Sequence, residues 1–133
     1  MTIGYGFPTG ETRTWIPTLG GTSTYTYQRG IYLRAHDIVH FSGRIAVALI
    51  GTGSTTTISG LPFVSADSDQ MVSVGFDFAL SLSVVSIQGA ILASSSSITF
   101  ASRTAASTGG TVVGIFGNSS TVTVSGSYFL RWD

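Results

Sequence analysis

Cysteine and lysine are both absent from these 133 residues. Without cysteine the chain forms no disulfide and offers no thiolate to a metal or a substrate. All six cationic side chains are arginines, six acidic side chains balance them, and the net charge at pH 7 is zero. Nucleic-acid-binding surfaces carry a basic excess. We therefore expect neither DNA nor RNA as a partner.

Charge of either sign is scarce as well. Charged residues make up 9% of the chain, far below the usual quarter or so. Serine (20) and threonine (18) must therefore cover much of the surface together with glycine. With a mean hydropathy of +0.40, we expect a subunit that hides much of this surface against other subunits. No apolar run is long enough to cross a membrane, so we expect no membrane insertion.

The clearest structural signal is a long alternating segment at residues 38–50, because side chains alternate across a strand. Its large apolar side chains occupy odd positions: Val39, Phe41, Ile45, Val47 and Leu49. Its small or polar side chains occupy even positions: His40, Ser42, Arg44, Ala46 and Ala48. This pattern predicts a central strand with one buried face.

Similar but shorter patterns recur along the chain, separated by glycine-, serine- and threonine-rich turns, and no segment has helical spacing with caps. We predict strands at residues 22–33, 58–63, 71–85, 90–93, 98–100, 112–116, 121–124 and 127–132. Turns are expected at residues 36–37, 86–89 and 117–118, and a bulge at Gly30. The expected fold is all-β, an antiparallel, jelly-roll-like sandwich of about eight strands at residues 20–133, preceded by an extended arm or edge segment at residues 1–19.

Catalytic or metal-binding groups do not form a recognisable pattern. His36 and His40 would lie too far apart on strands to share a metal ion. The favoured interpretation is that His36 lies in a turn and His40 on the polar face of a strand. Asp67 and Asp69 lack the glutamate that completes an EF-hand type of calcium loop. No Gly-x-Ser-x-Gly element accompanies the many serines. We expect no enzyme activity, no catalytic residue, no metal and no cofactor.

Aromatic residues gather toward the two ends of the sequence, as Tyr5, Phe7, Trp15, Tyr25, Tyr27, Tyr32, Tyr128 and Trp132. Exposed aromatic rings stack on sugars, whereas buried ones fill cores and subunit interfaces. The second interpretation is favoured, and the first stays open.

Several short elements appear in a characteristic order: Trp-Ile-Pro-Thr-Leu at 15–19, Gly-Arg-Ile at 43–45, Ile-Ser-Gly-Leu-Pro-Phe at 58–63 and Gly-Ser-Tyr-Phe at 126–129. Together they resemble the small trimeric β domains of tailed-phage virions, which have a jelly-roll or tumour-necrosis-factor-like knob. In that family such knobs form tail-fibre and tail-needle tips, and similar ones decorate phage heads.

The resemblance implies a homotrimer at the virion surface. Its expected interface uses the even face of the long strand and the last strand, with Arg44, Ala46, Ala48, Tyr128, Leu130 and Trp132. The arm would grip another virion protein, such as the major capsid protein, through Tyr5, Phe7 and Trp15.

Three functions follow from these observations. A head-decoration (cement) protein is favoured, because only a short arm and no shaft precedes the predicted sandwich. The alternative is a receptor-binding tip that recognises host surface polysaccharide through loops such as residues 65–70 and 103–110. A small hydrolase or lectin is the remote third possibility.

Overall fold

The computed structural model describes residues 12–81, 84, 86–105 and 109–130, apart from the side chain of Phe76. These residues form eight strands and no helix, so none of them belongs to a helix that could span a membrane. The strands are β1 (Thr12–Trp15), β2 (Thr24–Ala35), β3 (Ile38–Leu49), β4 (Thr57–Ile58), β5 (Gln70–Phe78), β6 (Ser86–Ile91), β7 (Ile98–Arg103) and β8 (Thr121–Phe129). The predicted all-β class is confirmed.

All neighbouring strands are antiparallel, in the order β1-β2-β3-β8-β5-β6-β7-β4. Three of the pairings are nested in sequence, since β3 pairs with β8, β4 with β7, and β5 with β6. A long hairpin that is rolled up produces such nesting. The topology is consistent with the jelly-roll-like sandwich that we predicted.

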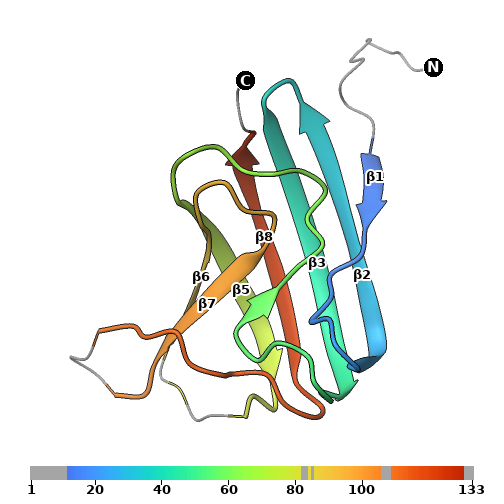
Figure 1. The fold of residues 1–133 in the computed structure, drawn as a ribbon, viewed down its shortest axis with the longest axis vertical. Coiled ribbons are helices and arrows are strands. Elements are labelled where there is room, and N and C mark those ends of the chain that lie inside the picture. Colours follow the sequence, from blue (N-terminus) through green and yellow to red (C-terminus); the bar gives the residue numbers. More distant parts are fainter. Residues whose placement is uncertain (1–11, 82–83, 85, 106–108, 131–133) are drawn as a thin grey trace.

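The sheet curls until its two edges meet. Thr18, just after β1, and Ser59, just after β4, exchange two backbone hydrogen bonds of 3.1 and 2.8 Å. In Figure 1, β4 and β7 lie in front of β5 and β8, which gives the curled sheet two layers. Side chains that point inward from both layers form one core.

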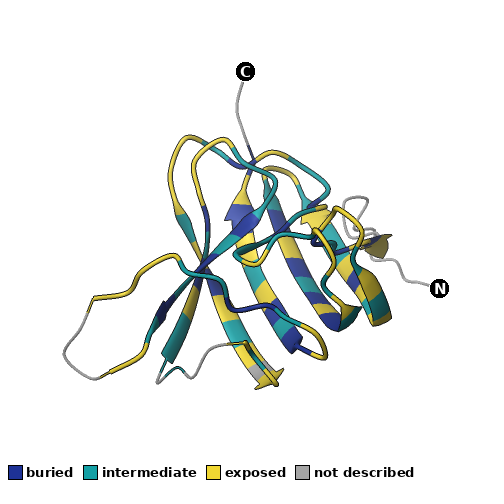
Figure 2. Ribbon diagram, turned by 60° about the horizontal axis from the view of Figure 1, so that its bottom comes forward, coloured by how far each residue is buried: buried dark blue, intermediate teal, exposed yellow. Residues whose placement is uncertain are grey.

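Strand β3 supplies the centre of this core. Its residues Val39, Phe41, Ile45 and Val47 are all buried, as the alternation at odd positions predicts. The prediction is wrong for Leu49, because its side chain is 59% exposed. Strand β8 pairs with β3 only as far as Ala46, so Leu49 lies beyond the packed layer. Figure 2 shows the resulting alternation of buried and exposed residues along the long strands.

Several predicted elements differ from the observed ones. Residues 112–116 form no strand, because Ile115 and Phe116 donate to the carbonyl of Thr55 rather than to a neighbouring ladder. Residues 86–89 belong to β6 instead of a turn. Strand β5 ends at Phe78, after a register shift against β8 that leaves Phe78 53% exposed.

The C-terminal part of the predicted arm or edge segment lies at the edge of the sheet. Residues 12–15 form the edge strand β1, and Trp15 and Leu19 are only 4% exposed. Residues 12–19 are therefore part of the sheet and its core. Residues 1–11 lie outside the described part of the chain.

Candidate functional site

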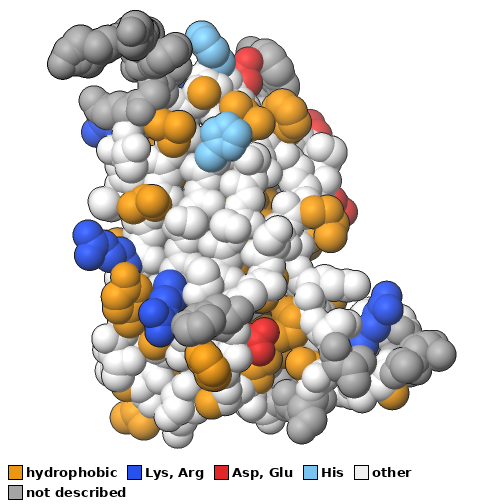
Figure 3. All heavy atoms as spheres, turned by 180° about the vertical axis from the view of Figure 1, so that it is seen from behind, with side chains coloured by type: hydrophobic (Ala, Val, Ile, Leu, Met, Phe, Trp, Pro, Cys, Tyr) orange, Lys and Arg blue, Asp and Glu red, His pale blue; other side chains and the backbone are white. Residues whose placement is uncertain are grey.

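The outer surface of the sheet, the side that faces solvent, is ordered in rows across β2, β3, β8 and β5. The strand register defines three complete rows: Ile31–Ser42–Ser125–Ser73, Arg29–Arg44–Thr123–Gly75 and Tyr27–Ala46–Thr121–Phe78. In the middle strands β3 and β8, serine, threonine and alanine occupy every position of these rows except that of Arg44. The other large side chains lie on β2 and at Phe78 of β5. Seen from behind in Figure 3, polar side chains and backbone fill the middle of this surface.

Hydroxyl groups in the middle of this surface bind their neighbours across the strands. His40 Nδ1 lies 2.7 Å from Ser127 Oγ, in a hydrogen bond between directly opposite residues of β3 and β8. Both residues are exposed. This contact gives His40 the structural role of a polar-face residue.

Large apolar side chains are exposed at the β5 side. Met71 of β5 is 72% exposed, Leu92 after β6 is 44% exposed, and Val112 is 58% exposed. Together they border a hollow of about 220 Å³ whose floor includes Gly89, Ala90 and Ala101. We call Met71, Leu92 and Val112 the apolar patch.

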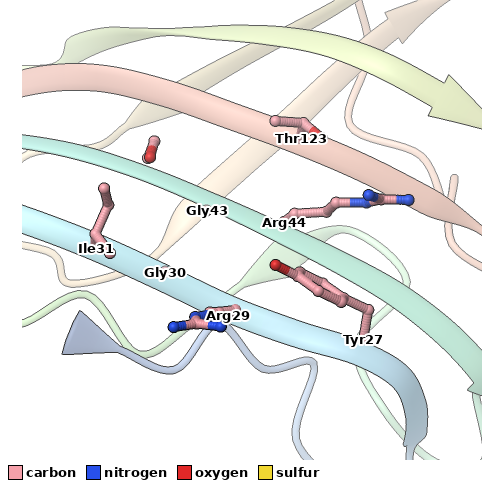
Figure 4. A pocket seen from close by; sticks show the side chains of 8 residues that line it. Tyr27, Arg29, Gly30, Ile31, Gly43, Arg44 and Thr123 are labelled. Atoms are coloured by element: carbon pink, nitrogen blue, oxygen red, sulfur yellow. The ribbon is translucent and has the colours of Figure 1, made fainter.

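A second hollow, of about 240 Å³, lies over β2 and β3. Its lining consists of Tyr27, Arg29, Gly30, Ile31, Ser42, Gly43, Arg44 and Thr123. We call it the arginine hollow. The Arg44 guanidinium lies 5.1 Å from the centre of the Tyr27 ring, in a cation–π contact. In Figure 4 the side chains of Arg29 and Arg44 extend in different directions from Gly30 and Gly43, with Tyr27 beside Arg44.

The backbone beneath the arginine hollow is fixed from the core side by Trp15. Gly30 and Gly43 are direct partners, and a Cβ on either would come within 2.4 to 2.6 Å of the indole. The Trp15 Nε1–H donates to the carbonyls of Ile31 (3.2 Å) and Ser42 (3.0 Å). Gly30 is therefore glycine because the indole occupies its side-chain space. The predicted bulge lies instead near Thr24 and Tyr25.

Tyr128 of β8 is the main polar group inside the core. Its side chain is fully buried, its hydroxyl donates to the Phe63 carbonyl at 3.1 Å, and the Phe63 N–H donates back at 3.3 Å. Burial raises the pKa of Tyr128 to about 12. The hydrogen bond with the Phe63 backbone lowers the pKa, and the electrostatic interaction with Tyr32 raises it. The hydroxyl thus stays neutral and ties the segment after β4 to β8.

Four of the nine predicted contact residues, one from the arm and three from the trimer interface, are buried within the chain. Trp15 (4%), Tyr128 (0%), Leu130 (6%) and Ala46 (8%) are too buried to form a large contact with another chain. Tyr128 is buried because its side chain lies on the inward face of β8, directly opposite the buried Val39 of β3. We therefore correct these four assignments.

The other predicted contacts are placed differently. Arg44 is exposed on the outer surface, and Ala48 is half-buried. Tyr5, Phe7 and Trp132 lie outside the described residues. The sequence analysis missed Met71, Leu92 and Val112. For Met71 the signal was present, because it occupies an odd position in a strand whose even positions are apolar.

Among the described residues, no group of three or more His, Asp or Glu side chains is placed to hold a metal ion. Asp67 and Asp69 instead bind the segment after β6. Asp67 accepts from the Ser94 hydroxyl at 2.6 Å, and Asp69 accepts from the Ala93 N–H at 2.9 Å. His36 lies in the β2–β3 turn with a φ of 57°.

Comparison of the chain with protein-family models, with curated proteins and with solved structures gives no match. The function must therefore be argued from the residues of this chain and from their arrangement.

Proposed function

We propose that this chain is a non-enzymatic structural protein of a tailed-phage virion. In this proposal it is a homotrimeric head-decoration (cement) protein that lies on the virion surface and stabilises the capsid. Its subunits associate through the apolar patch.

The apolar patch is the observation that carries the self-association. An apolar side chain as exposed as Met71 gains free energy when a partner removes it from water, by about 25 cal/mol per Å² of buried apolar surface. Leu92 and Val112 extend the same surface around an adjacent hollow. Met71 on one subunit can therefore enter the hollow of the next subunit.

Charge favours a second copy of this chain as the occupant. None of the residues that line the hollow of the apolar patch is charged. The chain as a whole has no net charge at pH 7, so identical copies do not repel one another. An uncharged hollow can therefore receive an apolar side chain from another copy without leaving a buried charge unpaired.

The virion role is supported by the ordered sequence elements at residues 15–19, 43–45, 58–63 and 126–129 that resemble phage β domains. An outer surface built mainly of serine and threonine also suits a subunit that forms few charged contacts. The contact with a capsid protein would involve Tyr5 and Phe7 in the arm, and this part stays a prediction.

Sedimentation velocity of the full chain tests the assembly. We expect a particle with about three times the 13.8 kDa mass of one chain. A stable particle of 13.8 kDa at micromolar concentration would contradict the proposal. The virion role is tested separately by immunogold labelling of phage particles that contain the chain, where dense label on the head is expected.

A receptor-binding tip is the second candidate, and the arginine hollow favours it. A cationic hollow with an aromatic wall is more typical of ligand recognition than of a surface that only stabilises a lattice. Immunogold label confined to the tail, with a few dozen copies per particle, would support this role over the decoration role.

A further inference from the structure

We infer that Met71 is a modification site, at which oxidation to methionine sulfoxide keeps the free subunit from assembling. The oxidant is hydrogen peroxide or another peroxide. The effect on assembly rests on the proposed self-association through the apolar patch, whereas the oxidation itself rests only on the position of Met71.

Sulfur occurs at two positions in this chain. The sequence contains no cysteine and two methionines, Met1 and Met71. Met1 lies outside the described residues. Cysteine and methionine are the side chains with a ladder of oxidised forms, and exposure favours their reaction. Within the described part of the chain, Met71 therefore carries the one sulfur atom that an oxidant can reach.

The position of Met71 in β5 exposes its sulfur to solvent. Side chains alternate along the strand, so the next residue, Val72, points into the core and is only 6% exposed. Met71 is 72% exposed, the largest value among the exposed apolar side chains of the described residues. Its direct partner on β6 is Ala90, and a single methyl group is too small to cover the thioether.

Oxidation changes the polarity of this side chain without a change of charge. One oxygen atom passes from the peroxide to the sulfur, so that an S–O bond forms while the O–O bond breaks. With hydrogen peroxide, water is the product that leaves, since the peroxide is reduced as the sulfur is oxidised. The resulting sulfoxide is polar and is reduced back to methionine by dedicated reductases.

The hollow beside Met71 favours the thioether over the sulfoxide. Six residues of its lining have no side chain that forms hydrogen bonds: Gly89, Ala90, Leu92, Phe100, Ala101 and Val112. The backbone of residues 89–91 is paired on both sides, with β5 and with β7. Gln88 and Thr99 are the polar members of the lining, and a bond from either would only replace the water that a sulfoxide gives up. Oxidation therefore removes the apolar gain that is proposed to hold the subunits together.

Assembly and oxidation are expected to exclude each other. In the proposed trimer Met71 is buried against the next subunit, so the oxidant reacts with free subunits. In dilute protein we expect Met71 to be oxidised at least about tenfold faster than at concentrations where the trimer forms, because exposure governs the reaction.

Peroxide treatment of the full chain tests the inference. Mass spectrometry of a peptide that contains residue 71 measures the oxidation, and sedimentation velocity measures the assembly. The oxidised chain should sediment as a 13.8 kDa particle under conditions in which the untreated chain is three times as heavy. Treatment with the two methionine sulfoxide reductases, one for each sulfoxide epimer, should restore the larger particle.

Met71→Leu is the matched control, because leucine keeps an apolar side chain of similar volume without sulfur. This variant should assemble and stay assembled in peroxide. Met71→Gln carries a polar, uncharged side chain and should stay monomeric without peroxide. Thermal melts of both variants confirm that they are folded.

The outcomes separate the inference from the proposed function. A parent chain that is monomeric before treatment would contradict the proposed self-association and the effect on assembly with it. A parent that assembles and keeps its mass after full oxidation of Met71 would overturn the inference alone. Dissociation of Met71→Leu in peroxide would do the same, because the oxidant would then act elsewhere. Resistance of Met71 to peroxide in the dilute monomer would overturn the modification site.

Discussion

The two sides of the outer surface differ in chemistry although they belong to one continuous sheet. Over β2 and β3 the exposed large side chains are Tyr27, Arg29, Ile31 and Arg44, around a hollow that includes two cations. Around β5, β6 and β7 they are Met71, Leu92 and Val112, around a hollow without charge. The middle strand β8 separates them with serine and threonine.

This difference bears on which side faces a protein partner. Burying the arginine side against an uncharged protein surface would take two guanidinium groups out of water, which costs free energy. Burying the apolar side carries no such cost. The apolar side is therefore the better candidate for a protein interface.

The largest expected effect comes from removing the support under the arginine side. Trp15→Ala should lower the free energy of unfolding by about 3–5 kcal/mol, because it leaves a large cavity beside Gly30 and Gly43. Urea unfolding followed by far-ultraviolet circular dichroism measures this loss. The neighbouring Ile16 is 64% exposed, so Ile16→Ala should change the free energy of unfolding by less than about 0.5 kcal/mol. Similar losses in both variants would show that the indole is not the key support.

Much of the fold could be predicted because its strands are buried on one side only. In β3 the odd positions had to be apolar, and the resulting period of two identified the strand and its inner face. The same pattern wrongly predicted a strand at residues 112–116. It is apolar because Ile115 and Phe116 enter the core, yet its hydrogen bonds go to an isolated carbonyl at Thr55.

The site could not be predicted to the same extent, because its parts are distant in sequence. The support under the arginine hollow joins residues 15, 30 and 43, and only the strand register brings them together. Likewise, Tyr128 lies in the core opposite Val39 of β3, a residue 89 positions earlier in the chain. The composition shows that charged residues are scarce, but it does not show where they lie in the folded chain.

A charge on the apolar side should disrupt assembly, whereas the same charge on the other side should not. Met71→Asp places a carboxylate on the surface that is proposed to be buried between subunits, where an unpaired charge is costly. We expect sedimentation velocity to shift from the trimer toward the 13.8 kDa monomer.

Thr14→Asp is the matched control for that experiment. Thr14 is exposed on β1, opposite Ile31 and far along the sheet order from β6. Its assembly state should be unchanged. If only the Thr14→Asp variant dissociated, the subunit interface would lie on the arginine side and not on the apolar side.

A smaller effect is expected at Tyr128, in the core strand that both sides share. Its pKa is raised from about 10 to about 12 in the folded state, so the unfolded state ionises first as pH rises. The stabilising effect is complete below pH 10 and is lost as pH rises toward 12, by at most about 1.4 kcal/mol per pH unit.

Urea unfolding of the parent and of Tyr128→Phe between pH 8 and pH 12 checks this effect. At pH 8 the variant should be less stable by about 1 kcal/mol, because the backbone of Phe63 loses a buried partner. Its stability should decrease less steeply above pH 10. Parallel curves for the two proteins would contradict the role of the Tyr128 hydroxyl.

The smallest effect is expected where the two sides meet, at the bond between His40 and Ser127. Ser127→Ala removes a hydrogen bond of 2.7 Å, but both side chains are exposed and water can replace the lost partner. We expect the free energy of unfolding to change by less than about 0.5 kcal/mol, with assembly unchanged. A loss above about 1 kcal/mol would mean that this pair is shielded from water in the assembled protein. The subunit interface would then cover the middle of the sheet as well as its apolar side.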